Sequence, residues 1–460
     1  GLVGVPVVAS PTEAFQVAIR HGVNGMLATT ASEWLAALLA LVDDPARRRA
    51  IGQAARDDVL DRYTPVARSR ALLDVLDEQW AGASAARARS VGAPFFSAPT
   101  EPQAALLESI MTPSQKPHLR IGWLIYWPIP GSGGFSNIFR IINLLAGFGH
   151  ENIIYMQPLG LPPEYIHRPE QYIRRHFGPV AATVQAWPDL IDEVDLALAT
   201  DWGSFEVLER CTPHVRKAYF VQDFEPFFNE MGYRYLKAEA TYRAGVPCIT
   251  LGNWLATFLR ETYDATTYPF DFAVEHERYH PRRSARPDQT RIFFYARPST
   301  PRRCFELGAA ALAIVHERHP EVEIVLFGDL GLTTLPVKFP FEDLGILDHE
   351  ELAKLYASST IGLVLSATNP SLMPPEMMAS RCAVIDLDLP PNHYLIDHSR
   401  TGLLIEPQPA PLADAICRLL EDEPLRLRLV DNAEAAVKAL SWEHSARQVE
   451  QAMLTIAPLT

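Results

Sequence analysis

The order of apolar and polar positions along the chain predicts strands that alternate with helices over most of its length. In the middle of the chain, short apolar runs bounded by turn residues predict buried strands near 119–126, 153–157, 195–200, 217–222 and 246–251. A second set of such runs predicts strands near 291–296, 322–328, 361–366, 382–387 and 402–405. Apolar strands separated by helical segments are typical of parallel sheets that helices cover on both faces. The sequence therefore predicts two doubly wound α/β units in succession.

The first eighty residues repeat the order of elements that closes the chain. They contain a buried strand, a turn with a short strand, and helices predicted at about 33–42, 45–60 and 65–80. In this repeat, His21 aligns with His398, and Arg47 aligns with Arg426. We therefore expect residues 1–80 to be the last part of an upstream module of the same kind, with most of its sheet missing.

A segment of linker-like composition separates the first eighty residues from the two predicted α/β units. Residues 81–117 are rich in Ala, Ser and Pro and show little periodicity, which is typical of a linker. Residues 118–275 are predicted to form the first complete α/β unit, and residues 276–440 the second. Ser441 has the position of an N-cap, so a final helix is predicted over 441–460.

Composition and charge exclude several classes of protein. The chain is 48% apolar and 21% charged, as in ordinary soluble globular proteins. Its net charge of −14 offers no basic face to a nucleic acid. The five cysteines are scattered, which predicts buried thiols in a reducing, cytoplasmic compartment rather than a disulfide frame or a metal site. No apolar run reaches the length of a membrane span, and the chain opens in a strand-like segment rather than a signal peptide, which indicates a fragment of a longer protein.

The segment from Ser366 to Asp388 carries the strongest functional signal. A polar loop follows an apolar strand there, and a helix carrying Glu376 comes next. In a parallel sheet such a loop lies at the carboxyl end of the strands, where ligands bind. The helix is predicted to start near Leu372, and its first N–H groups, together with the Ser371 hydroxyl, suit a phosphate. Glu376 lies about one turn into this helix, where its carboxylate could accept from the hydroxyls of a ribose.

A second loop supplies positive charge. The strand predicted at 291–296 is followed, before a helix, by the run Arg297-Pro-Ser-Thr-Pro-Arg302-Arg303. Guanidinium groups bind phosphate oxygens in pairs, so three arginines at a strand end suit a diphosphate. Either loop alone is best interpreted as a solvated turn, but their occurrence in order within one α/β unit favours a shared anion site.

Two further segments at predicted strand ends are candidates for the same site. Gly133 and Gly134 belong to a glycine-rich loop before a helix predicted from Asn137. This loop is either a tight turn or a place where the backbone approaches the phosphates of one substrate or a second substrate. Asp223 follows another predicted strand in the run Gln-Asp-Phe-Glu. Its carboxylate either caps a helix or holds, or deprotonates, an acceptor hydroxyl.

Together, these motifs resemble the GT-B glycosyltransferases of the large retaining family four, from about residue 118 to residue 460. Arg297 matches the diphosphate-binding arginine of that family, and Arg302 takes the place of its lysine. Glu376 matches the second of two glutamates separated by seven residues, which is the ribose ligand. The first glutamate falls on Thr368, a departure at the position that normally faces the donor sugar. The resemblance implies donor contacts by Gly133, Gly134, Arg297, Arg302, Arg303, Thr368, Ser371, Leu372 and Glu376.

Two runs narrow the resemblance further. The run from Tyr295 to Gly308 and the segment Phe220-Val-Gln-Asp-Phe-Glu-Pro resemble a rhamnosyltransferase-like subgroup that builds bacterial surface glycans. The implied fold is GT-B: two Rossmann-like, doubly wound parallel-sheet domains face a cleft, and the final helix crosses back to the first. The amino-terminal fragment would be a partial α/β addition to this fold.

The resemblance also implies a reaction. A hexose or deoxyhexose, such as rhamnose, would be transferred from a dTDP-, UDP- or GDP-linked donor to an oligosaccharide or lipid-linked glycan acceptor. The enzyme would work in the cytoplasm, in peripheral contact with the inner face of the membrane. The diphosphate would depart with anomeric retention and without a metal or other cofactor. Arg297 and Arg302 would stabilise the leaving group, and Asp223 would act on the acceptor. Two alternatives stay open: a GT-B sugar-nucleotide epimerase, and a non-catalytic glycan-binding or scaffold module.

Overall fold

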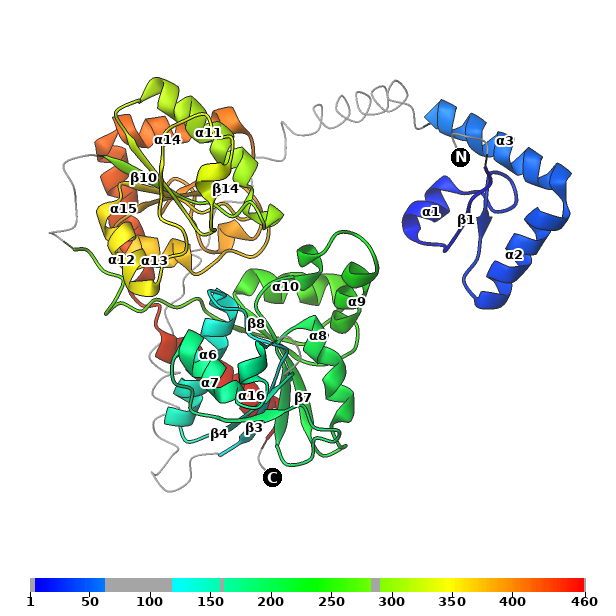
Figure 1. Cartoon of the computed structure of the whole chain (residues 1–460), viewed down its shortest axis with the longest axis horizontal. Helices are drawn as coiled ribbons and strands as arrows, with labels where there is room; N and C mark the ends of the chain where they lie inside the picture. The colour runs from blue at the N-terminus through cyan, green and yellow to red at the C-terminus, as the bar shows by residue number, and fades with distance from the viewer. Residues whose placement is uncertain (1–4, 63–117, 158–160, 283–289, 459–460) are drawn as a thin grey trace. The chain divides into compact units, whose positions relative to one another are not determined.

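The computed structural model describes residues 5–62, 118–157, 161–282 and 290–458, in two compact units (Figure 1). The amino-terminal unit comprises the described residues up to 62, and the main unit comprises those from 118 onward. The main unit contains two parallel sheets, each with the strand order of a doubly wound sheet. The predicted fold class is therefore confirmed.

The first sheet of the main unit has seven parallel strands in the order β5-β4-β3-β6-β7-β8-β9. Their bounds are β3 (Arg120–Ile125), β4 (Glu151–Met156), β5 (Thr183–Ala186), β6 (Leu196–Ala199), β7 (Arg216–Val221), β8 (Cys248–Leu251) and β9 (Thr267–Phe270). The sequence predicts all of them except the two edge strands. β5 is largely exposed and β9 contains Pro269, so neither has the apolar run that marks a buried strand.

The second sheet has six parallel strands in the order β12-β11-β10-β13-β14-β15. Their bounds are β10 (Arg291–Tyr295), β11 (Glu323–Phe327), β12 (Glu342–Asp343), β13 (Ile361–Leu363), β14 (Ala383–Leu387) and β15 (Leu403–Ile405). The sequence predicts all except β12, a short edge strand of acidic residues. The strand order reverses between β3 and β6 in the first sheet and between β10 and β13 in the second. Ligands of doubly wound sheets bind at the carboxyl ends of the strands beside this reversal.

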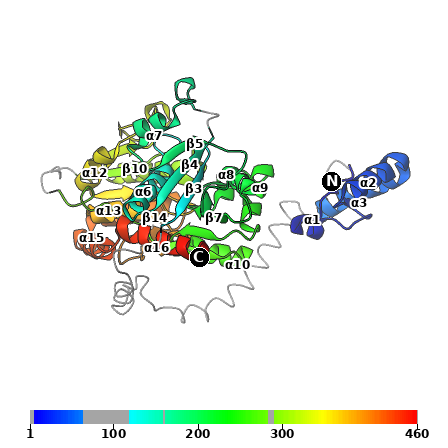
Figure 2. The same ribbon diagram turned by 90° about the horizontal axis from the view of Figure 1, so that it is seen from below.

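Helices cover both faces of each sheet (Figures 1 and 2). Those around the first sheet are α6 (Gly133–Gly147), α7 (Pro169–Phe177), α8 (Trp202–Phe205), α9 (Tyr233–Tyr242) and α10 (Asn253–Tyr263), with 3-10 turns η1 (Pro163–Tyr165), η2 (Glu206–Arg210) and η3 (Glu225–Phe228). Those around the second are α11 (Phe305–Arg318), α12 (His349–Ser358), α13 (Met373–Ala379), α14 (Pro409–Glu421) and α15 (Glu423–Val437), with η5 (Pro301–Arg303), η6 (Leu332–Thr334) and η7 (Asn392–Tyr394). The last helix, α16 (Trp442–Ile456), contacts α6 and β9 of the first sheet.

Successive side chains along the central strands enter cores on opposite faces. On β3, Trp123 packs in the core that contains α6 and α16, while Leu124 packs in the core that contains α9 and α10. On β10, Phe293 and Phe294 divide in the same way. Burial on both faces explains the continuous apolar runs in the sequence. No helix in the described ranges is long and apolar enough to cross a membrane.

Helix α6 begins at Gly133 rather than at the predicted Asn137. Gly131 makes the preceding turn with a φ of +77°, and Ser132 is extended. Gly133 and Gly134 therefore form the first helical turn instead of a loop. A glycine disfavours a helix by about 1 kcal/mol relative to alanine, and the buried apolar face of α6 offsets that cost.

The amino-terminal unit is small and repeats local structure of the main unit. Its elements are β1 (Val8–Ala9), α1 (Glu13–Ala18), β2 (Met26–Leu27), α2 (Ala31–Asp43) and α3 (Pro45–Arg62). Leu27 N donates to His21 Nδ1 at 2.9 Å, and Leu404 N donates to His398 Nδ1 at 3.0 Å. The same hydrogen bond in both places supports the predicted alignment of the two histidines. The helix predicted at 65–80 lies outside the described residues.

The arginine of the repeat is corrected by one position. Arg48 Nη1 donates to Leu41 O at 2.7 Å, and Arg426 Nη1 donates to Leu419 O at 2.6 Å. Arg48, and not Arg47, is therefore the structural equivalent of Arg426. The one-position error arises from matching Pro45 with Pro424, because Pro45 is the first residue of α3 whereas Pro424 is the second residue of α15.

The amino-terminal unit exposes an apolar row on α2. Leu35, Leu38 and Leu39 are about half exposed. The equivalent face of α14 is buried in the main unit, where α14 packs on α11. Among the described residues, the amino-terminal unit has no helix in the place of α11.

Candidate functional site

Three arginines gather at the carboxyl end of β10. Arg297 follows the strand, and Arg302 and Arg303 close the turn η5. In the described part of the chain, the Nε atoms of Arg297 and Arg302 are buried without a hydrogen-bond partner. Burial, and after it the charge of Arg303, lowers the pKa of Arg302. Because buried charged donors without partners are costly, this cluster is suited to an anion that accepts their hydrogen bonds.

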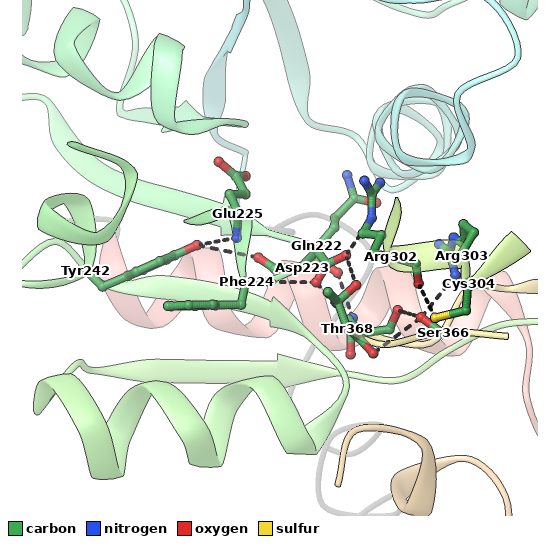
Figure 3. Close-up of polar contacts among 11 residues, drawn as sticks. Gln222, Asp223, Phe224, Glu225, Tyr242, Arg302, Arg303, Cys304, Ser366 and Thr368 are labelled. Atoms are coloured by element: carbon green, nitrogen blue, oxygen red, sulfur yellow. Dashed lines mark hydrogen bonds and ion pairs between the residues drawn. The ribbon is translucent and has the colours of Figure 1, made fainter. Parts of the chain in front are cut away.

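The loop after β13 lies against this arginine cluster (Figure 3). Arg303 Nη1 donates to Ser366 Oγ at 3.0 Å, and Ala367 N donates to Arg302 O at 3.0 Å. From β14, Asp386 Oδ1 accepts from Ser366 N at 2.8 Å. The two loops that the sequence assigns to one anion site are therefore adjacent and directly connected.

Asp386 and Asn392 fix the start of this loop, and sequence reasoning missed both. Asn392 Nδ2 donates to Ser366 O at 2.9 Å, which complements the bond from Asp386. Burial raises the pKa of Asp386 to about 8, although the N–H groups of Leu387 and Ser366 oppose the shift. The signal that could have found Asp386 is an acidic residue inside an otherwise apolar strand, Ala-Val-Ile-Asp-Leu.

Helix α13 offers fewer N–H groups than the sequence analysis assumes. Leu372 is its N-cap, and the N–H of Met373 donates to Ser371 Oγ at 3.3 Å. The next two residues, Pro374 and Pro375, have no N–H. The expectation that several N–H groups at this helix start face a phosphate is therefore wrong, and the arginines remain the main anion donors of the site.

Asp223 links the two sheets and caps no helix. Its Oδ2 accepts from Thr368 Oγ1 at 3.0 Å, and its Oδ1 accepts from Asn369 N at 3.1 Å (Figure 3). Arg302 Nε lies 4.0 Å from Asp223 Oδ2. The turn η3, which follows Phe224, starts without a side-chain cap. A carboxylate of the first sheet therefore lies beside the arginines of the second.

The environment of Asp223 bears on the departure at Thr368. Where the resemblance places a glutamate, Thr368 instead donates to a carboxylate that comes from the other sheet. Burial raises the pKa of Asp223, while the N–H of Asn369 and the charge of Arg302 oppose the shift. An acidic group thus lies beside Thr368, and it is supplied by the segment after β7 rather than by the loop after β13.

Gln222 ties the first turn of α6 to the same cluster. Its Nε2 donates to Gly134 O at 3.1 Å, and its Oε1 accepts from Asn137 Nδ2 at 3.0 Å. Its backbone carbonyl accepts from Asn369 Nδ2 at 2.6 Å. A Cβ at Gly134 would lie 3.3 Å from Gln222 Nε2, so glycine permits this close approach. Open space surrounds the Cβ position of Gly133.

Glu376 lies in a buried charged network that the sequence does not predict. Its side chain is buried, which raises its pKa to about 8, and the charge of Arg140 from α6 is the strongest opposing influence. Arg140 Nη2 donates to Glu275 Oε2 at 2.8 Å, and Arg278 Nη1 donates to the same oxygen at 2.9 Å. Glu376 on the second sheet is therefore coupled to a helix of the first.

The arrangement as a whole can bind an anion and orient a hydroxyl. Arg297 and Arg302 provide buried cationic donors, and Asp223 provides a carboxylate close to them. Across the described ranges, no group of three or more His, Cys, Asp or Glu side chains is arranged to hold a metal ion.

Two known families match different parts of the chain. The family described as "WsaF, C-terminal domain" matches residues 290–417, which contain the arginine cluster and Glu376. The family described as "Glycosyl transferase-like" matches residues 2–74. The second match covers the amino-terminal unit, whose structure repeats part of the main unit.

Curated relatives match this chain over only part of their own length. The O-antigen biosynthesis protein RfbC of Myxococcus xanthus is 34% identical over 342 residues, which cover 71% of this chain and 27% of that protein. The D-inositol 3-phosphate glycosyltransferase of Nocardioides sp. is 31% identical over 137 residues, which cover 28% of this chain and 29% of that protein. The chain thus spans less than a third of the length of either relative.

Solved structures share the architecture of the main unit. Anabaena Alr3699/HepE in complex with UDP and glucose has a TM-score of 0.59 at 14% identity, over 74% of this chain and 100% of that chain. Sucrose-phosphate synthase from Thermosynechococcus elongatus has a TM-score of 0.57 at 17% identity, over 73% of this chain and 98% of that chain. WaaG, a glycosyltransferase involved in lipopolysaccharide biosynthesis, has a TM-score of 0.55 at 15% identity, over 74% of this chain and 100% of that chain. At these identities the likeness establishes the fold alone.

Proposed function

We propose that this chain, whose main unit has the GT-B fold and whose residues 2–74 match the "Glycosyl transferase-like" family, transfers a sugar from a nucleoside diphosphate donor to a glycan acceptor. One observation carries the proposal: at the strand reversal of the second sheet, the buried Nε atoms of Arg297 and Arg302 have no hydrogen-bond partner within the described part of the chain. A donor diphosphate would supply the acceptor oxygens that these donors need. The carboxylate of Asp223 lies beside the same place and could receive an acceptor hydroxyl.

The nature of donor and acceptor is proposed from the relatives and from the sequence motifs. HepE binds UDP and glucose, which supports a nucleotide-sugar donor. RfbC is named for O-antigen biosynthesis, which supports a bacterial surface glycan as the acceptor. The run from Tyr295 to Gly308 supports a hexose or deoxyhexose, with rhamnose as the first sugar to test. We propose anomeric retention on the same resemblance.

The proposed roles follow from the chemistry of transfer. The bond between the anomeric carbon and the diphosphate oxygen breaks, and its electron pair leaves with the nucleoside diphosphate. Arg297 and Arg302 would stabilise the negative charge that develops on this leaving group. Asp223 would hold the acceptor hydroxyl and accept its proton as the new bond to the anomeric carbon forms. Glu376 would accept hydrogen bonds from the ribose.

The proposal is tested by following the donor. A thermal-shift screen over UDP, GDP and dTDP identifies the nucleotide, and the matching sugar donors are then incubated with and without acceptor glycan. Transfer to the glycan, with slow hydrolysis in its absence, is the expected result. Inversion of the donor at C2 would instead indicate an epimerase, and binding without any turnover would indicate a scaffold.

The variant Glu376→Gln is expected to reduce the loss of stability at rising pH. Glu376 has a folded-state pKa of about 8, against an ordinary value of 4.5. Between these values the unfolded carboxyl ionises while the folded one keeps its proton, so the wild-type free energy of unfolding falls as pH rises. Glutamine has no such proton to retain. Urea denaturation at about pH 5 and about pH 8 measures the difference, and an equal loss in both proteins would contradict the buried acid.

The same variant also tests the ribose contact. Above about pH 8, where Glu376 is ionised, Glu376→Gln should weaken the binding of UDP more than that of 2′-deoxy-UDP, because only the ribonucleotide presents both hydroxyls to the carboxylate. Glu350→Gln is the matched control, since Glu350 is an exposed glutamate in the first turn of α12. If Glu376→Gln changed both affinities equally, the ribose role would be wrong.

Removal of residues 1–112 is expected to leave nucleotide binding and turnover unchanged. The described part of the amino-terminal unit contributes none of the residues of the candidate site. Its removal also takes away the exposed apolar row on α2, so the shortened protein should be more monodisperse by light scattering. Lost turnover with an unchanged circular dichroism spectrum of the main unit would show that the amino-terminal unit belongs to the working enzyme.

A further inference from the structure

An exposed apolar segment borders the candidate site on the side of the first sheet. It runs from η3 into α9 and is called here the 227–236 segment. Within these ten positions, five large apolar side chains are between 44% and 77% exposed: Phe227, Phe228, Met231, Tyr233 and Leu236. Single exposed apolar residues are ordinary, whereas such a concentration marks an interaction surface.

A buried aromatic layer holds this segment in place. Phe224, just before η3, and Tyr242, at the end of α9, are almost completely buried. Their rings stack at a centroid distance of 5.5 Å, and Tyr242 also stacks on Tyr219 at 5.7 Å. The inward positions are therefore already filled by aromatic rings. Phe227 still packs edge-on against Phe224 at a centroid distance of 4.7 Å. Met231, Tyr233 and Leu236 remain more than half exposed although the aromatic core beneath them is complete.

The segment is continuous with the arginine cluster. The Arg302 guanidinium lies 4.3 Å from the centroid of the Phe228 ring, a cation–π contact. Whatever binds the 227–236 segment therefore comes close to the diphosphate-binding arginine and to Asp223. That position is where an acceptor has to arrive if the proposed function holds.

The composition of the segment favours a lipid surface over a sugar chain. Sugars stack on aromatic rings, but the side chains of Met231 and Leu236 offer nothing to sugar hydroxyls. Met, Leu, Phe and Tyr side chains at one edge, with basic residues beside them, are suited to the boundary between headgroups and acyl chains. Arg234 is exposed in the same stretch, whereas Lys237 is half-buried and its Nζ pairs with Glu206 Oε1 at 2.7 Å. Glu230 is the one acidic residue between positions 227 and 237.

We propose that the 227–236 segment docks the protein on a bilayer, with Met231 and Leu236 entering the acyl boundary. The inference rests on the proposed function, because it assigns a membrane-borne acceptor to the transferase site. Docking through this edge would place Arg302 and Asp223 next to the headgroup region, within reach of a glycan attached to a lipid. The segment would thus bring the lipid-linked acceptor to the site, while the residues of the second sheet bind the nucleotide-sugar donor.

The test uses the full chain and protein-free vesicles of phosphatidylethanolamine and phosphatidylglycerol. We expect the wild type to co-sediment with the vesicles. The double variant Met231→Ser/Leu236→Ser should partition to vesicles at least about tenfold less, because each substitution removes an apolar side chain that would enter the acyl boundary. Leu190→Ser is the matched control, because Leu190 is equally exposed in the connection between β5 and β6. It should bind vesicles as the wild type does.

The outcomes separate this inference from the proposed function. UDP binding is measured on every variant, and it should stay unchanged because the substituted residues are exposed and touch none of the site residues named above. No vesicle binding by the wild type, or equal binding by all three proteins, would overturn the docking surface while leaving nucleotide binding intact. A wild type that self-associates in gel filtration without binding vesicles would also overturn it, since the segment would then be a contact between copies.

Discussion

Replacing Arg302 with alanine is expected to weaken the binding of a nucleoside diphosphate by about 10- to 150-fold, which corresponds to about 1.5–3 kcal/mol for a hydrogen bond to a charged group. The Nε atom of Arg302 is buried and has no hydrogen-bond partner among the described residues, and Arg297 and Arg303 lie close to the guanidinium. A phosphate oxygen that accepts from this buried Nε gains a hydrogen bond that water supplies poorly at such a position. Titration calorimetry with UDP and with uridine measures the effect, and uridine should bind Arg302→Ala as it binds the wild type.

Two further variants separate charge from geometry. Arg302→Lys keeps the positive charge but loses the planar fork, so it should recover only part of the affinity. Arg318→Ala is the control for loss of an arginine elsewhere, since Arg318 pairs with Asp414 on the surface of the second sheet. If Arg302→Ala weakened the binding of uridine and of UDP to the same extent, the arginine would support the local fold and would not bind the diphosphate.

The strands of both sheets were predictable where burial on two faces leaves a continuous apolar run. β10 shows this directly, because its central residues, Ile292 to Phe294, are completely buried. The edge strands β5, β9 and β12 were not predictable, since an edge strand is paired on one side only and needs no such run. The edge strand β15 was predictable because Leu403 and Leu404 are nevertheless buried. The start of α6 was missed for a different reason. Glycine is read as a loop residue, but tertiary packing of the helix outweighs its local preference.

The candidate site was predictable in its loops and not in its connections. The loops that carry Arg303 and Ser366 follow strands whose ends must meet at one edge of a parallel sheet, so their contact follows from topology. The bonds from Gln222 and Asp223 to the loop after β13 join residues almost 150 positions apart. No local pattern encodes such a contact. The same holds for the coupling of Glu376 to Arg140, which lies on a helix of the other sheet.

The variant Asp223→Asn is expected to lower turnover by about 100-fold or more, the range for loss of a group that accepts a proton in the transition state. Donor binding should be unchanged or slightly tighter, because the substitution removes a negative charge that lies 4.0 Å from Arg302. These opposite signs distinguish a catalytic role from a general loss of structure. Steady-state kinetics with varied donor measures kcat and KM, and kcat alone should fall.

The substitution is conservative for the link between the sheets. An asparagine oxygen can still accept from Asn369 N, and its amide can donate to the hydroxyl of Thr368, so the contacts made by Asp223 are replaced rather than lost. Thr368→Val is the matched control, because it removes one donor to the carboxylate and leaves the charge in place. It should lower kcat only severalfold. If Asp223→Asn kept full turnover, or if Thr368→Val lowered turnover as much, the carboxylate would serve only to join the two sheets. The acceptor proton would then have to leave by another route, directly to the departing diphosphate that Arg297 and Arg302 hold.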